Sequence, residues 1–201
     1  MTSVAELPAG FADKVLSAQS TFRSVMDAMA RPGSVQRIGS VAGAPGAMMR
    51  GTAAIAPTLF DHDTPIWLDS LLSATPDVAR WLKFHTSAPV VTDSSIASFA
   101  LVGDPENLPG LDRFAFGSNE YPDRSTMLIL QVESLTDGSM VELQGPGIDG
   151  AATLRASIRP RDLFERLAIN AALFPRGIDV VLVHDDSIVA IPRTTRLVRG
   201  G

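Results

Sequence analysis

Side chains that can bind a metal ion or transfer a proton gather at three places in the sequence. These are Asp61, His62 and Asp63, then His85, and then His184, Asp185 and Asp186. None of these groups has two histidines at i and i+4, the spacing that puts two metal ligands on one face of a helix. Aspartates also end helices and form turns, and a histidine at a helix end is commonly a half-buried structural residue. The pattern favours these structural roles over a metal site or a general base.

Other residue types narrow the chemistry further. The chain has no cysteine, which excludes disulfides, thiol nucleophiles and cysteine-ligated zinc or iron–sulfur centres. Its two lysines, Lys14 and Lys83, lie on predicted amphipathic helices. A solvent-exposed place on such a helix accounts for both residues without a role in Schiff-base chemistry. No serine lies in the Gly-x-Ser-x-Gly pattern of a hydrolase nucleophile. We therefore expect no complete catalytic set, no cofactor and no metal ion.

A glycine-rich turn is a weaker candidate. Gly145-Pro-Gly147 follows a predicted strand, which is a position where glycine loops bind phosphate. The turn lacks the lysine and the spacing of a P-loop, and Pro146 has no amide hydrogen to donate. A tight structural turn is the favoured interpretation.

The arginines are the strongest remaining signal. Arg23, Arg176 and Arg193 lie in apolar or turn-rich surroundings, and Arg193 is followed by Thr194. A guanidinium group binds phosphate, phosphonate or carboxylate through paired hydrogen bonds. It binds an acidic patch on a partner protein equally well, so the residues alone leave anion contact and partner contact open.

Arg193 and Thr194 are expected to be held by a β-hairpin. After a break at Pro175 and Gly177, two apolar runs over 178–183 and 188–191 flank a pair of aspartates. This pattern is typical of a buried hairpin. Pro192 ends the second run because it cannot donate to a ladder. The hairpin is predicted to present residues 193–195 at a sheet edge.

The rest of the chain alternates helices and strands. We expect helices over residues 11–29, 52–60, 76–85 and 162–174, and strands over 34–38, 66–68, 99–102, 126–135, 139–144 and 154–158. Within 126–135, Met127, Leu128, Ile129, Leu130 and Val132 form a nearly continuous apolar run, which is typical of a strand buried on both faces. It joins 139–144 too tightly for a parallel crossover, so that pair is predicted to be antiparallel. The expected fold is α/β, a three-layer α/β/α sandwich around one mixed sheet.

Three helical details are predicted as well. Thr75 and Asp162 are expected to act as N-caps, the latter in a capping box with Glu165. Pro57 is expected in the first turn of its helix or at a kink. The first helix is predicted to bury one apolar stripe, formed by Phe11, Val15, Ala18, Phe22, Val25 and Met29, and the last predicted helix a face formed by Leu163, Phe164, Leu167, Ala171 and Phe174.

Composition sets the class of protein. With 201 residues, 45% of them hydrophobic and 19% charged, the chain is expected to form one globular domain over residues 1–201. The net charge of −5 argues against a non-specific nucleic-acid or membrane-surface binder, because both need a basic face. No apolar stretch reaches the roughly 20 residues that span a bilayer. Residues 1–10 lack the features of a secretion signal, so a cytoplasmic protein is expected.

Seven sequence blocks, in order, resemble the PhnH family, the H subunit of the bacterial carbon–phosphorus lyase system. The blocks are residues 21–33 (TFRSVMDAMARPG), 61–68 (DHDTPIWL), 84–90 (FHTSAPV), 128–132 (LILQV), 145–148 (GPGI), 174–179 (FPRGID) and 190–195 (AIPRTT). The resemblance implies a fold similar to that of pyridoxal-phosphate transferases, without the cofactor. It also implies a homodimer when the protein is alone.

The resemblance implies a role in phosphonate breakdown. In that family the protein belongs to a core complex with the G, I and J subunits. The complex attaches a phosphonate to the ribose of ATP with loss of adenine, which gives ribose 1-phosphonate 5-triphosphate. The nucleosidase-like step is attributed to the I subunit, and the J subunit breaks the carbon–phosphorus bond on an iron–sulfur cluster. A cysteine-free chain cannot hold that cluster.

The expected role is therefore that of a subunit without catalytic residues of its own. The residues expected to contact a ligand or a partner are Arg23, His85, Asp179, Arg193 and Thr194. Substitution of Arg193 by alanine is expected to leave the fold intact but to weaken complex assembly or activity. An alternative is a free-standing enzyme or binding protein for a phosphorylated small molecule that uses Arg23, Arg193 and Thr194. A scaffold dimer without a ligand is a third possibility.

Overall fold

The computed structural model describes residues 14–39, 41 and 43–198, and these form two β-sheets with helices packed around them. The larger sheet has seven strands in the order β1 (Gln36–Arg37), β9 (Ser187–Ile191), β8 (Asp179–His184), β5 (Met127–Gln131), β4 (Phe99–Val102), β2 (Ile66–Leu68) and β3 (Val90–Val91). Five neighbouring strands, from β8 to β3, run parallel, and β9 runs antiparallel to both β8 and β1. The predicted α/β class with a mixed sheet is confirmed.

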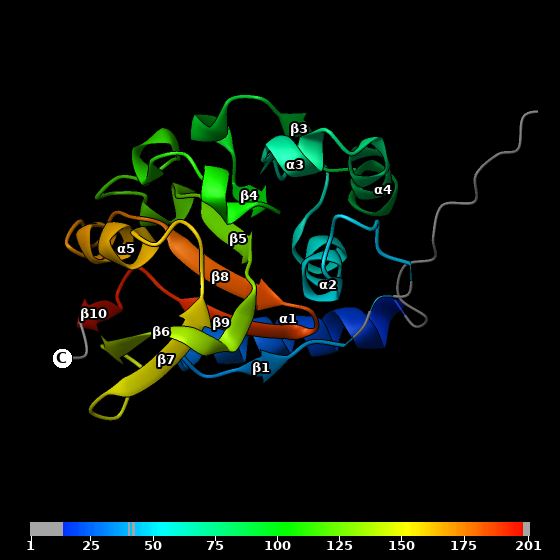
Figure 1. Cartoon of the computed structure of the whole chain (residues 1–201). Helices are drawn as coiled ribbons and strands as arrows, with labels where there is room; N and C mark the ends of the chain where they lie inside the picture. The colour runs from blue at the N-terminus through cyan, green and yellow to red at the C-terminus, as the bar shows by residue number, and fades with distance from the viewer. Residues whose placement is uncertain (1–13, 40, 42, 199–201) are drawn as a thin grey trace, which may run out of the picture.

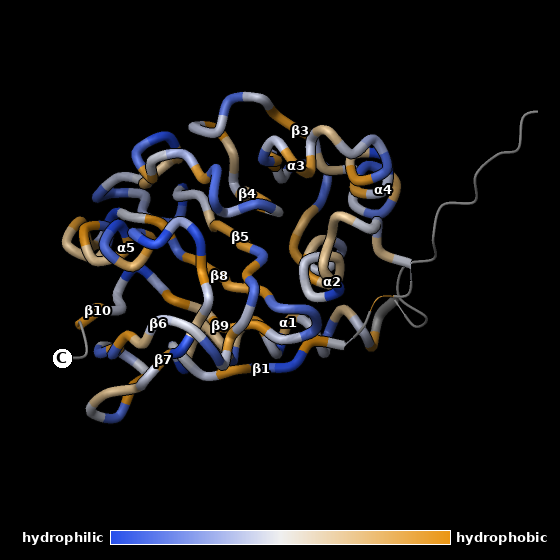
Figure 2. The backbone as a smooth tube through the Cα atoms, viewed as in Figure 1, coloured by the Kyte–Doolittle hydropathy of each residue, from blue (hydrophilic) through white to orange (hydrophobic). Residues whose placement is uncertain are grey.

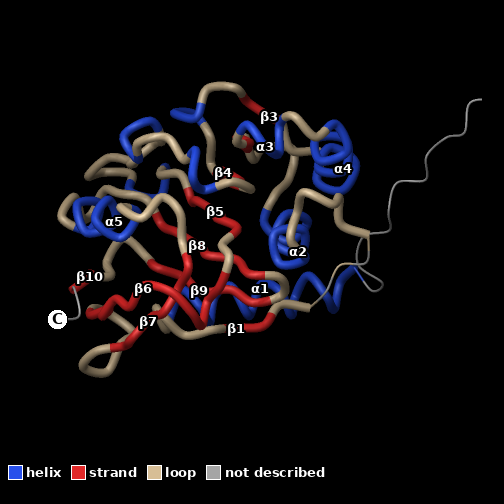
Figure 3. The backbone as a smooth tube through the Cα atoms, viewed as in Figure 1, coloured by secondary structure: helices blue, strands red, loops and turns tan. Residues whose placement is uncertain are grey.

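The two faces of the large sheet are covered differently (Figures 1 and 3). One core contains residues of α1 (Lys14–Ala30), α2 (Arg50–Leu59), α3 (Ser70–Ser73) and α4 (Pro76–Thr86). The other contains residues of α5 (Leu163–Ala171) and of a three-stranded sheet in the order β10 (Arg196–Val198), β6 (Ser134–Gln144) and β7 (Ala152–Ser157). The sequence analysis did not predict this second sheet. Short 3₁₀ helices occupy Ser94–Ile96, Pro105–Asn107, Leu111–Arg113 and Pro122–Arg124.

Alternation along the central strands explains their continuous apolar runs. In β8, Val181 and Val183 face the helical core, whereas Val180 and Leu182 face the core beneath the small sheet. Successive side chains of a strand point to opposite faces, so a strand covered on both sides must be apolar at every position. The central strands accordingly carry hydrophobic colour along their length in Figure 2.

The prediction for residues 126–144 is wrong in its pairing. Strand β5 ends at Gln131, and β6 belongs to the other sheet. Between them the backbone changes partner, because Val132 N–H donates to Val183 of the large sheet and Glu133 N–H donates to Ser157 of the small sheet. The segments predicted as an antiparallel pair are therefore not paired. The short connection carries the chain from one layer to the next.

Two predicted buried faces are also partly wrong. On α1 the buried residues include Thr21, Val25 and Ala28, and Phe22 is 50% exposed; Phe11, from the predicted stripe, lies outside the described residues. Phe174 is 62% exposed, because α5 ends at Ala171 and the residues beyond it no longer share its face.

The predicted caps do not form although both helices begin where expected. Thr75 Oγ1 donates to the carbonyl of Leu71 at 3.0 Å instead of capping α4. The Asp162 carboxylate makes no cap hydrogen bond to the start of α5 and instead accepts from Arg166 Nε at 2.9 Å. Pro57 lies in the last turn of α2 and not in the first.

The predicted hairpin is confirmed, but it lies inside the sheet. β8 and β9 pair antiparallel, and β8 is itself paired with β5 on its other side. At the turn Asp185 has a φ of 52°, in the left-handed region that aspartate tolerates better than most residues. Its carboxylate accepts from Arg50 Nε at 2.7 Å and also from Arg50 Nη2. The turn is thereby fastened to the start of α2.

This ion pair predicts a pH-dependent contribution to stability. The hydrogen bond from Arg50 holds the pKa of Asp185 below its ordinary value. A carboxyl group with a lowered folded-state pKa stabilises the fold above its unfolded pKa, about 3.9, and this contribution is lost as the pH falls through the folded pKa. Replacement of Asp185 by asparagine, which keeps the left-handed turn, is expected to lower the urea midpoint slightly near pH 7.

The difference in urea midpoint between wild type and Asp185→Asn is expected to shrink on acidification, because the Asp185 carboxylate becomes protonated. It is also expected to shrink in high salt, because both side chains of the ion pair are about half exposed. Urea unfolding at several pH values measures it. Arg50→Gln provides the control, since it should remove the same ion pair. In that background Asp185→Asn is expected to cause no further change in the urea midpoint. If the difference in urea midpoint stayed constant from neutral to acid pH, the Arg50–Asp185 ion pair would not be its source.

Candidate functional site

Asp179 and Arg193, predicted to contact a ligand or partner, lie together at the base of the hairpin. Val180 pairs with Ile191, so the residues just outside that pair, at the start of β8 and after Pro192, lie side by side. The Asp179 carboxylate accepts from Arg193 Nε at 3.1 Å, from Arg193 Nη2 and from the Arg193 backbone N–H at 2.8 Å. The two residues are 14 positions apart in the sequence, and the register of the hairpin brings them into direct contact.

The guanidinium of Arg193 uses all its donors within the chain. Beyond Asp179, Nη1 donates to the carbonyls of Pro122 at 2.7 Å and Pro175 at 3.5 Å, and Nη2 donates to Ser125 Oγ. Arginine has five N–H donors, and these contacts supply an acceptor for each. Side-chain exposure is 12% for Arg193 and 15% for Asp179. The pair therefore joins the hairpin to the 122–125 and 175 segments, and contact of Arg193 with an anion would break these bonds.

The other three candidates lie apart from this pair or face another direction. Thr194 follows Arg193 but lines a different cavity. Arg23 is exposed on α1. His85 is half-buried on α4, with its ring 4.4 Å from the Trp81 ring and 5.0 Å from the Phe84 ring, measured between centroids. The structure thus groups Asp179 and Arg193 but does not assemble the five residues into one site.

A cavity of about 530 Å³ lies beside this pair. It opens at the amino ends of β4, β5 and β8, and its lining includes Ser95, Ser98, Asp123, Arg124, Asp179 and Arg193. Arg124 stacks 4.1 Å from the centre of the Tyr121 ring. Asp179 and Arg193 neutralise each other, so together they give the cavity wall no net charge. The serine hydroxyl groups of the lining can still form hydrogen bonds.

At the opposite edge, the carboxyl ends of the parallel strands carry buried polar side chains that bind backbone. This edge is where open α/β sheets commonly bind ligands. Buried Asp69 accepts from the N–H groups of Leu72, Gly103 and Asp104 at 2.7–2.9 Å. Gln131 accepts from Met49 N–H and donates to the Ala47 carbonyl. These side chains fix loops 103–104 and 47–49, which is a structural role.

The histidine and aspartate side chains singled out in the sequence also bind neighbouring groups of the chain, each at its own place. Asp61 accepts from Thr64 Oγ1 at 2.7 Å and from the Asp63 N–H at 3.0 Å, and these hydrogen bonds lower its pKa. His184 Nδ1 lies 3.1 Å from the Val132 carbonyl. Over the described ranges, no three histidine or acidic side chains come close enough to hold a metal ion.

The glycine turn at 145–147 also has a structural reason. A Cβ added at Gly147, where φ is 82°, would lie 2.0 Å from the Ala30 carbonyl oxygen, and one at Gly145 would lie 2.9 Å from that of Thr194. Only glycine allows the backbones at the end of α1 and before β10 to approach this turn so closely. This geometry supports the tight structural turn over a phosphate loop.

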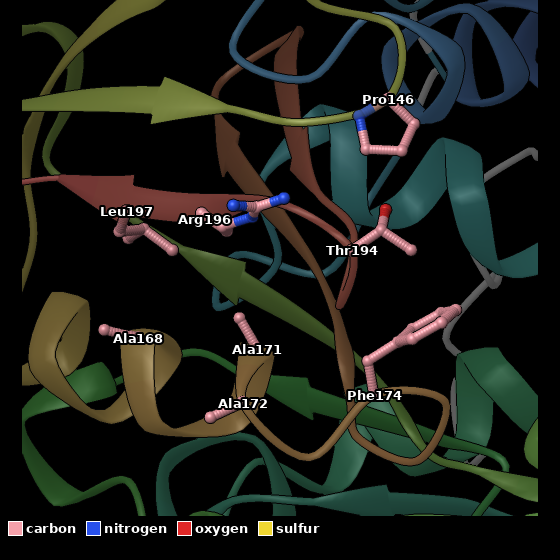
Figure 4. A pocket seen from close by; sticks show the side chains of 8 residues that line it. All are labelled: Pro146, Ala168, Ala171, Ala172, Phe174, Thr194, Arg196 and Leu197. Atoms are coloured by element: carbon pink, nitrogen blue, oxygen red, sulfur yellow. The ribbon is translucent and has the colours of Figure 1, made fainter.

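A groove that the sequence pattern does not predict lies between α5 and β10. One cavity of about 420 Å³ and another of about 220 Å³ share Ala168 and Leu197 in their linings. We call the pair the α5–β10 groove, lined among others by Ala168, Ala171, Phe174, Thr194, Arg196 and Leu197. In Figure 4 the Arg196 side chain lies across the groove from the alanines of α5. The sequence pattern predicts Phe174 on a helix face and assigns Arg196 to no element, so Thr194, a predicted contact residue, is the one signal that pointed to this groove.

Arg193 is expected to contribute to stability, contrary to the sequence-based expectation that its removal leaves the fold intact. Arg193→Ala leaves the Asp179 carboxylate largely buried without its cation, and breaking such a pair costs about 3–5 kcal/mol. Arg193→Lys keeps the charge but cannot reproduce the five-donor geometry, so it should also destabilise. Urea unfolding measures both.

Arg23→Ala is the matched control, since Arg23 is exposed on α1 and such substitutions change stability by about 0.5 kcal/mol or less. If Arg193→Ala unfolded at the wild-type midpoint, the contacts of Arg193 would carry no net stability.

Two curated relatives match this chain over nearly its full length. The first, from Rhizobium meliloti (strain 1021), is named "Alpha-D-ribose 1-methylphosphonate 5-triphosphate synthase subunit PhnH" and is 42% identical over 200 residues, which cover 99% of this chain and 100% of the relative. The second, from Stutzerimonas stutzeri, is named "Putative C-P lyase subunit protein HtxG". It is 29% identical over 200 residues, covering 98% of this chain and 95% of the relative.

Residues 9–198 match the family described as "Bacterial phosphonate metabolism protein (PhnH)". This match covers most of the chain, including both sheets and all five α-helices of the described part. Together with the full-length 42% identity, it shows that the chain belongs to the PhnH family of bacterial phosphonate metabolism proteins.

Proposed function

We propose that this chain is a subunit of the carbon–phosphorus lyase core complex and works there with the G, I and J subunits. Its part is in forming ribose 1-phosphonate 5-triphosphate from ATP and an alkylphosphonate in the cytoplasm. The observation that carries the proposal is the full-length match to a relative named as a subunit of ribose 1-methylphosphonate 5-triphosphate synthase. The second relative, named as a C-P lyase subunit, supports the same assignment.

The proposed role is assistance to the catalytic subunits and not catalysis by this chain alone. The absence of cysteine from the sequence rules out the cysteine-ligated iron–sulfur cluster of the lyase step. Asp179 and Arg193, the strongest charged candidates, bind each other and the surrounding backbone. Within the described residues, no helix is long and apolar enough to cross a membrane. Alone, the chain is proposed to form a homodimer.

Co-expression tests the assembly directly. A tagged copy of this chain, produced together with homologues of the G, I and J subunits, is expected to co-purify with them in one size-exclusion peak. An unrelated protein with the same tag is the control. Failure to recover any of the three subunits by mass spectrometry would contradict the proposal.

Ligand binding by the isolated protein separates this proposal from a free-standing phosphate-binding protein. Such a protein would need the guanidinium of Arg193, whose donors are occupied by Asp179, Pro122, Pro175 and Ser125. Calorimetry with ATP, methylphosphonate and pyridoxal phosphate is therefore expected to detect no submicromolar binding. Submicromolar binding of any of the three compounds by the isolated wild-type protein would favour the alternative.

A further inference from the structure

The α5–β10 groove has the shape of a docking site for an elongated apolar group. Its two cavities adjoin along α5, whose nine residues extend for about 13 Å at roughly 1.5 Å per residue. The floor at Ala168 and Ala171 consists of methyl groups, so that a bulky side chain can approach the helix closely. Figure 4 shows these alanines facing the strand that carries Leu197 and Arg196. An extended groove of this kind suits a run of side chains better than one compact ligand.

The rim of the groove exposes large apolar side chains. Phe174 is 62% exposed and Met140 is 45% exposed, and each lines one of the two cavities. Aromatic and Met side chains are enriched in protein interfaces, so their exposure beside a concave apolar surface marks a binding surface. Phe84 has a similar exposure, 66%, but lies on α4, on the other side of the large sheet.

The charge in the groove defines the partner further. Arg196 is exposed and, among the described residues, has no ion-pair partner. On α5 itself, Arg166 pairs with Asp162 at 2.9 Å. Arg161 and Glu165 also line the groove, so its lining carries two guanidinium groups and one carboxylate, an excess of positive charge in a chain whose net charge is −5. A carboxylate on the bound segment would complement it through charge-assisted hydrogen bonds.

We propose that the α5–β10 groove binds an apolar segment of another subunit of the complex, and that a carboxylate of this segment pairs with Arg196. This inference rests on the proposed function. Phe174 packs against the apolar part of the segment, and the alanine floor of α5 receives its side chains. The three-stranded sheet and α5, which cover one face of the large sheet, thereby also form the surface for assembly.

Binding of purified full-length variants to the subcomplex of G, I and J homologues tests the groove. Phe174→Asp and Arg196→Glu each place a carboxylate where an apolar group or a carboxylate of the partner is proposed to lie, and each is expected to weaken binding by about 30-fold or more, the loss typical of an interface hot spot. Arg196→Lys should retain most of the affinity. Each substitution lies at an exposed position, so circular dichroism and unfolding midpoints are expected to match the wild type.

Two matched controls make the result specific. Phe84→Asp introduces the same charge at an equally exposed phenylalanine of α4, and Arg155→Glu reverses an exposed arginine on β7. Both are expected to bind within about threefold of wild type. A loss of affinity in the controls that equals the loss in Phe174→Asp and Arg196→Glu would overturn the assignment of the groove.

The outcomes separate this inference from the proposed function. If the wild-type chain does not bind the subcomplex, the proposed function fails and the docking site fails with it. If the wild type binds and both groove variants bind equally well, the subunit assignment stands and the groove is not the docking site. If the variants instead lose affinity for a small phosphorylated ligand alone, the groove is a small-molecule site and the docking proposal is overturned.

Discussion

The architecture depends on burying β5, β8 and β9 on both faces. Their side chains are apolar at nearly every position, so each face of the large sheet needs its own cover. Four helices cover one face. The other face has α5, which is only nine residues long, and the three-stranded sheet supplies the remaining apolar surface. The short connection at Val132 and Glu133 follows from this need, because it takes the chain straight from the first layer into the second.

The return of the chain to the second layer explains the arrangement around Arg193. After β9 the backbone must leave the large sheet at Pro192, which ends the ladder, before it can pair with β6 as β10. Arg193 lies at this departure point and binds Asp179 at the start of β8. The charged pair thus fixes the place where the chain changes layers. Its low exposure and complete set of acceptors fit a structural part better than a catalytic group.

Local patterns in the sequence predicted the elements well, and long-range packing set the rest. The runs at 178–183 and 188–191 identify the hairpin because both the apolar residues and the turn lie in one short segment. The change of sheet at Val132 is hard to see locally, since only Glu133 and Ser134 separate Val132 from the next apolar residue, Leu135, and neither is a strong turn signal. The Asp179–Arg193 contact was accessible in principle, because the hairpin register places them side by side. The exposure of Phe174 was not, since it depends on where α5 ends.

The candidate site shows the same division between local and long-range information. Arg193 drew attention as an arginine beside threonines, yet its environment is supplied by residues 122, 125 and 175, which only the fold brings near. Arg196 drew none, although it is exposed, lines the α5–β10 groove and forms no ion pair within the described part of the chain. A guanidinium whose donors are satisfied inside a subunit holds that subunit together. One whose donors are free beside an apolar surface is available to another molecule, and in a family of complex subunits that molecule is best sought among the partner chains.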